Sequence, residues 1–129
     1  MARPTATQPT EVELQILGIL WEQKNATARE IHNRIIEVRE TNYSTTVKML
    51  SVMLEKGLVK RNDSVRPQLF QAAATQQKTQ SGMLKDLMQR AYDGSVGSLV
   101  LQALSAKKAT KAELAEIREM LDRLEGDKQ

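Results

Sequence analysis

The spacing of apolar residues changes over one short stretch of the chain, and this change limits the fold more than any other feature. In residues 58–72 apolar side chains alternate with a period of two on either side of the polar tip 62–67, as in a β-hairpin. Three segments before this stretch and three after it have helical spacing instead. The sequence therefore predicts a mostly α protein with one small β-hairpin between two groups of three helices.

Capping residues mark the ends of these helices. Threonine and glutamate stand three residues apart at positions 10 and 13, 27 and 30, and 110 and 113, and each pair can satisfy free amide groups at a helix start. Either Asn42 or Ser44 can cap the third helix, and Gly57 ends it because glycine adopts the left-handed conformation easily. We expect the first three helices to end near residues 23, 38 and 56.

Composition excludes several classes of function. The chain has no cysteine, which removes disulfides, thiolate metal sites and cysteine nucleophiles. The single histidine, His32, leaves no second imidazole for a histidine zinc site, and Ser44 with His32 lacks an organised acid or oxyanion group. We therefore expect no enzyme, no metal and no cofactor. His32 is expected at the surface or boundary of the second helix, and Trp21 in the core.

Charge and hydropathy indicate the environment of the chain. The net charge is only +3, so a surface for nucleic acid must come from local clustering of cations. No run approaches the roughly 18 apolar residues that a membrane span needs, and residues 1–5 lack the apolar core of a signal peptide. We expect a soluble, cytoplasmic protein with no membrane insertion.

Three helices closed by a β-hairpin are typical of a winged helix-turn-helix, in which the third helix enters the major groove of DNA. We expect this domain in residues 1–74 and a helical dimerisation domain in residues 75–129. The apolar residues expected to face inward on the third helix are Val47, Leu50, Met53 and Leu54. The small polar or cationic residues expected to face outward are Ser44, Thr45, Lys48 and Ser51.

The candidate DNA contacts combine this outward face with two helix starts and the hairpin tip. Helix starts can bind phosphate through free amides, and a cation at the tip can reach the DNA backbone or minor groove. Thr46 is the weaker candidate because it can face the edge of the core. The candidates are Thr27, Arg29, Tyr43, Ser44, Thr45, Thr46, Lys48 and Arg66. Without the winged-helix context, a polar face of this kind is as typical of a capped, solvated helix as of a DNA-contacting helix.

The C-terminal helices carry apolar stripes that need a partner. They can form a core within the chain, but a winged helix that closes within residues 1–74 leaves them little to cover. A second subunit is therefore the simpler expectation. The candidate dimerisation residues are Met83, Leu84, Leu87, Met88, Leu99, Val100, Leu104, Ile117 and Leu121.

Residues 43–61, from Tyr-Ser-Thr-Thr-Val-Lys to Gly-Leu-Val-Lys-Arg, resemble the penicillinase repressor family, which includes the methicillin-resistance repressors. Residues 13–17 with Leu20 and Trp21, residues 28–32, and residues 93–95 with Leu99 and Val100 resemble it in the same order and spacing. The resemblance extends from about Pro9 to Leu124. It implies a homodimeric transcriptional repressor that binds a palindromic operator in double-stranded DNA through its winged helix.

The resemblance also implies a mode of induction. In the best-known members a membrane-bound sensor metalloprotease responds to β-lactam and triggers cleavage of the repressor at an Asn-Phe bond. The corresponding bond here is Gln102–Ala103. The copper-responsive branch of the family is excluded because its metal switch resembles a cysteine-rich tail, and this chain has no cysteine. The alternative outside this class is a winged helix that docks proteins and binds no specific DNA sequence.

Overall fold

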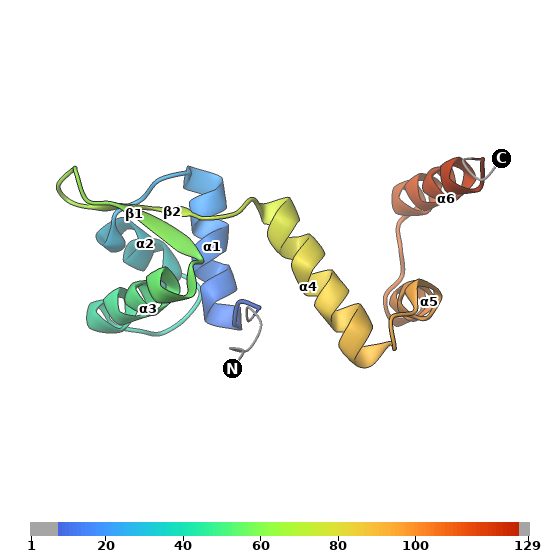
Figure 1. Cartoon of the computed structure of the whole chain (residues 1–129), viewed down its shortest axis with the longest axis horizontal. Helices are drawn as coiled ribbons and strands as arrows, with labels where there is room; N and C mark the ends of the chain where they lie inside the picture. Colours follow the sequence, from blue (N-terminus) through green and yellow to red (C-terminus); the bar gives the residue numbers. More distant parts are fainter. Residues whose placement is uncertain (1–7, 127–129) are drawn as a thin grey trace, which may run out of the picture. The chain divides into compact units, whose positions relative to one another are not determined.

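The structure of the chain is a computed structural model that describes residues 8–126. Three helices, a hairpin and three further helices follow one another, as predicted (Figure 1). The elements are α1 (Glu11–Gln23), α2 (Ala28–Ile35), α3 (Tyr43–Lys56), β1 (Val59–Asn62), β2 (Leu69–Ala72), α4 (Gln76–Ala91), α5 (Val96–Ala106) and α6 (Lys111–Gly126). Residues 1–5, which the signal-peptide prediction concerns, lie outside the described part.

The chain divides into two compact units, one reaching Leu84 and the other beginning at Lys85. We describe each unit by itself. The division falls within α4, whereas the domain boundary expected from the sequence, after residue 74, precedes that helix. The boundary at residue 74 stays a prediction.

The predicted caps form and set where the helices begin. At the start of α1, the Thr10 hydroxyl accepts from the Glu13 amide at 3.2 Å, and the Glu13 carboxylate accepts from the Thr10 amide at 2.9 Å. The same reciprocal pair of bonds precedes α2 and α6. Asn42, and not Ser44, caps α3 by accepting from the Thr45 amide. Gly57 ends α3 with a φ of 80°.

The core of the first unit lies between α1, α2, α3 and one side of the hairpin. Its fully buried side chains include Ile16, Leu17, Leu20, Ile31, Ile35, Leu50 and Met53. The strands are antiparallel, with Val59 opposite Ala72 and Arg61 opposite Phe70. Phe70 also exchanges two backbone hydrogen bonds with Ala26, just before α2. These bonds fix β2 to the segment that precedes α2, while the loop at the tip of the hairpin extends beyond the helices (Figure 1).

Three expectations about the helices are wrong. Val47 is 42% exposed and does not face inward; Thr46, 3% exposed, takes the inward position. His32 is buried, not at the surface, and its Nδ1 lies 2.8 Å from the Thr46 hydroxyl. Each polar side chain provides a buried partner for the other, so both can enter the core. Finally, α2 ends at Ile35 and only turns follow through Val38, whose side chain is 64% exposed.

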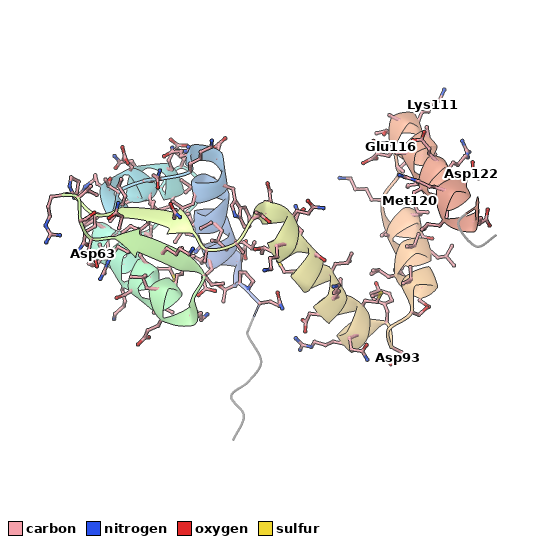
Figure 2. All side chains as sticks on the ribbon, turned by 45° about the horizontal axis from the view of Figure 1, so that its top comes forward. Asp63, Asp93, Lys111, Glu116, Met120 and Asp122 are labelled. Carbon is pink, nitrogen blue, oxygen red and sulfur yellow. The ribbon has the colours of Figure 1, made fainter. Side chains whose placement is uncertain are left out.

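The second unit has no core of its own among its described residues. No side chain of α5 or α6 is buried. Several large apolar side chains are exposed instead, including Val96, Leu101 and Met120, the last labelled in Figure 2. No helix in the described range is both long and apolar enough to cross a bilayer.

Candidate nucleic-acid interface

The exposed side of α3 consists mainly of small side chains around one cation. Ser44, Lys48 and Ser51 are exposed on this side, with Thr45 beside them. Among residues 8–126 no ion pair involves Lys48, so its ammonium is available to an anion. Small neighbours let a helix approach a base pair closely, while a lysine can donate to guanine or to phosphate. This side of α3 therefore suits the major groove.

A chain of side-chain contacts holds the start of α3 against α2. The guanidinium of Arg29, in the first turn of α2, lies 3.9 Å from the centre of the Tyr43 ring. The other partner of Tyr43 is His32, whose ring meets it edge to face at 5.6 Å between centroids. His32 in turn bonds the buried Thr46. Because cation, ring and hydrogen bond lock the two helices together, the exposed face of α3 has a fixed direction.

A second link fixes the far end of α3 to the start of α1. Lys56 Nζ donates to Glu13 Oε2 at 2.7 Å, and the Glu13 side chain is 2% exposed. Burial by itself would raise the pKa of the Glu13 carboxyl. The hydrogen bonds from Lys56 and from the Thr10 amide, with the charge of Lys56, outweigh burial and hold that pKa below its ordinary value. Glu13 is therefore a charged, buried anchor of α3.

A groove of about 280 Å³ lies between the start of α2, the edge of α3 and the hairpin. Its wall is largely apolar, with Val47, Leu54 and Phe70 contributing, and two arginines, Arg29 and Arg61, also line it. A sugar-phosphate strand has the matching chemistry, because its sugars are weakly polar and its phosphates are anionic. The groove therefore continues the surface of α3 toward the hairpin.

The hairpin tip is organised by short polar contacts. Arg61 Nε donates to Asp63 Oδ1 at 2.6 Å, in the loop that follows β1, where Figure 2 labels Asp63. Asn62 Oδ1 accepts from the amide and the hydroxyl of Ser64, which holds the first turn of the loop. Arg66 is exposed near the end of this loop. Within the described part of the chain, no ion pair involves Arg66, whereas Arg61 is already held by the Asp63 carboxylate.

The structure brings some of the predicted contact residues together and separates others. Thr27, Arg29 and Tyr43 all line the groove, whereas Thr45 and Thr46 line a different hollow, between α1 and the start of α3. Ser44, Lys48 and Arg66 are exposed outside both. Thr46 is buried and hydrogen-bonded to His32, so we remove its side chain from the candidate contacts.

The groove also contains Val47, Ser51 and Arg61, which are not among the eight candidate contacts, although Ser51 was expected on the outward face of the third helix. The signal for Arg61 was available: Val59 is the inward residue of β1, and the hairpin alternates. Val47 could not be found in this way, because its apolar character indicated the core.

A comparison with known protein families gives a match. The sequence profile of the penicillinase repressor matches residues 9–123 of the 129 residues, which cover α1 to α5 and nearly all of α6. No curated protein matches the chain. The family is one of DNA-binding transcription regulators and not an enzyme class. The chain therefore belongs to the penicillinase repressor family of transcriptional repressors.

Proposed function

We propose that the chain is a homodimeric repressor that binds a palindromic operator in double-stranded DNA. In this proposal α3 lies in the major groove, with Ser44, Thr45 and Lys48 toward the bases and nearest phosphates. The start of α2 and the hairpin contact the flanking backbone through Thr27, Arg29 and Arg66. Tyr43 contributes by supporting Arg29 through the ring contact.

The observation that carries the proposal is the exposed side of α3. Eight residues of α3 are exposed, and Lys48 is the only cation among them apart from the last residue, Lys56. Both ends of the helix are anchored, by Arg29 with Tyr43 at one end and by Glu13 with Lys56 at the other. A helix that is fixed at both ends and lined by small side chains is suited to enter a groove without rearrangement.

The second subunit is argued from the C-terminal helices. Their apolar side chains include Leu87 at 47%, Leu104 at 37% and Leu121 at 53% exposed. The unit that carries these side chains has no core among its described residues. Exposed apolar surface on such a unit marks an interface. Homodimerisation is also what the family suggests. A two-fold protein suits a two-fold operator, because the same patch and the same recognition helix occur twice.

The inducing signal belongs to the proposal as well. We propose that repression is relieved by a membrane-bound sensor metalloprotease or by another inducing signal. The bond that would be cut, Gln102–Ala103, lies inside α5, and both residues are exposed. Proteolysis of a helix requires local opening. Within one chain α5 has no buried side chain to oppose that opening, so the dimer contacts of residues such as Leu104 would be what resists it.

DNA binding can be tested with the full chain and a library of random duplexes. After selection, the enriched sequences should contain an inverted repeat. For the best duplex, Lys48→Ala should weaken binding by about tenfold, the effect of losing one base or phosphate contact. The matched control is Lys78→Ala, an exposed lysine of α4 away from the proposed surface. Recovery of no inverted repeat, or equal losses in the two variants, would favour a protein-docking module and contradict the proposal.

Dimerisation can be tested by sedimentation equilibrium. One chain has a mass of 14.5 kDa, so the dimer has 2 × 14.5 = 29.0 kDa. Replacing Leu121 by glutamate should give the single-chain mass, because a charge would be buried without a partner. Glu116→Lys, an exposed polar position of the same helix, is the control and should stay dimeric. A single-chain mass for the unchanged protein at micromolar concentration would refute the dimer.

A further inference from the structure

Val47 is an exposed apolar side chain at the centre of the proposed interface. It is the fifth residue of α3 and 42% exposed, and the groove beside α3 includes it. Its neighbours on the same side of the helix, Ser44 three residues before and Ser51 four residues after, are small and exposed. Tyr43 and Leu50, the other neighbours of Val47 on the helix, line the groove with it, and part of the valine side chain stays accessible from outside.

We propose that Val47 selects thymine at one position of each operator half-site by packing against the thymine 5-methyl group. This inference rests on the proposed DNA binding and names a determinant of its sequence specificity. In the major groove an A·T pair offers a methyl group, whereas the edges of a G·C pair offer only hydrogen-bonding atoms. Valine has no donor or acceptor, so it would desolvate those polar atoms without replacing their hydrogen bonds.

Its position on α3 makes Val47 the better candidate than the other exposed valine, Val52. Residues near the start of a recognition helix contact the base edges, because that end enters the groove most deeply. Val47 lies about one turn from the cap Asn42, whereas Val52 lies in the second half of the helix. Val52 is 36% exposed, close to Val47 in exposure and the same residue type. It therefore serves as a matched control.

The size of the effect follows from burial of one methyl group. Removing one thymine methyl should weaken binding by roughly fourfold at one half-site, the factor that corresponds to one buried methylene-sized group. When both half-sites of the palindrome are changed, independent effects multiply to roughly fifteenfold. Both factors lie well within the precision of fluorescence anisotropy.

The experiment replaces thymine by uracil, one symmetric pair of positions at a time, in the operator selected by the full chain. Uracil lacks only the 5-methyl group, so base pairing is kept. The unchanged protein should lose affinity at one thymine position. Val47→Ala should remove the difference between thymine and uracil at that position, while Val52→Ala should keep it. Both variants should unfold at nearly the same urea concentration as the unchanged protein, because both side chains are exposed.

The outcomes separate this inference from the function on which it rests. Operator binding with no uracil effect at any position, or an effect that persists in Val47→Ala, overturns the role of Val47 and leaves the proposed function standing. An effect lost equally in Val52→Ala also overturns it. Failure to bind any duplex overturns the proposed function together with the inference.

Discussion

The buried pair between Glu13 and Lys56 offers the sharpest test of how α3 is held. Glu13→Gln keeps the size of the side chain and an oxygen that can accept from the Thr10 amide, but it removes the charge. Lys56 then keeps its ammonium beside a neutral amide. Only the ion pair between α1 and α3 is lost, so the variant isolates that contact from the helix cap.

The loss in the free energy of unfolding depends on how exposed each partner of the ion pair is. Removing one partner of a fully buried pair costs about 3–5 kcal/mol, because a charge is left buried. The Lys56 side chain is 33% exposed, so water can solvate the ammonium that remains. We therefore expect Glu13→Gln to lower the free energy of unfolding by about 1–2 kcal/mol. Glu13→Ala should cost about 1 kcal/mol more, because the reciprocal cap is also lost.

Urea unfolding followed by tryptophan fluorescence measures this loss directly. Trp21 is the only tryptophan, and its indole N–H donates to the Ala74 carbonyl at 2.9 Å, so its emission reports the first unit. With a slope of about 1 kcal/mol per molar urea, the midpoint should fall by about 1–2 M. Urea is preferred because a salt denaturant would screen the pair. Equal protein concentrations keep the effect of dimerisation constant.

Acid provides an independent check with a definite sign. The pKa of Glu13 is lower in the folded chain than its ordinary value of 4.5. Its stabilising contribution is therefore complete above that ordinary value and is lost as the pH falls through the folded pKa. The stability difference between the unchanged protein and Glu13→Gln should shrink in the same range. The double variant Glu13→Gln with Lys56→Met should recover part of the stability, since no unpaired charge remains. A midpoint for Glu13→Gln equal to that of the unchanged protein would refute the reasoning.

Two further predictions concern the hydrogen-bonded core and the hairpin. Thr46→Val should lower the free energy of unfolding by about 1–3 kcal/mol, because His32 loses its buried partner; the exposed Thr45→Val should change it by less than about 0.5 kcal/mol in the same urea titration. Asp63→Asn should free Arg61 for phosphate and raise DNA affinity about twofold to fivefold at low salt. The control is Asp86→Asn, another aspartate paired with an arginine, in α4; equal affinities for the two variants would contradict a role for Arg61 in binding.

Local sequence signals predicted most of the elements. The capping boxes at Thr10, Thr27 and Thr110 place helix starts because their hydrogen bonds join residues only three positions apart. The end of α3 at Gly57 depends on the backbone freedom of that one residue. The hairpin depends on the alternation of apolar and polar residues along the two strands. The family resemblance, carried mainly by α3 and β1, is confirmed.

The candidate interface was predicted less completely, because its residues meet only across separate elements. Thr27, Ser44 and Lys48 followed from helix starts and a helix face. The alternation of the hairpin places Arg61 on the same side of β1 as Val59, but only the packing of the hairpin brings that side to the groove beside α2 and α3.

What the sequence by itself determined is the series of helices and strands, together with the polar character of α3. Tertiary structure alone decided which of two neighbouring residues enters the core. A valine is ordinarily buried in preference to a threonine, yet Thr46 is buried and Val47 is exposed. The reason lies fourteen residues away, at His32, whose ring nitrogen satisfies the threonine hydroxyl inside the core. Such a contact between distant residues cannot be deduced from the residue types at either position.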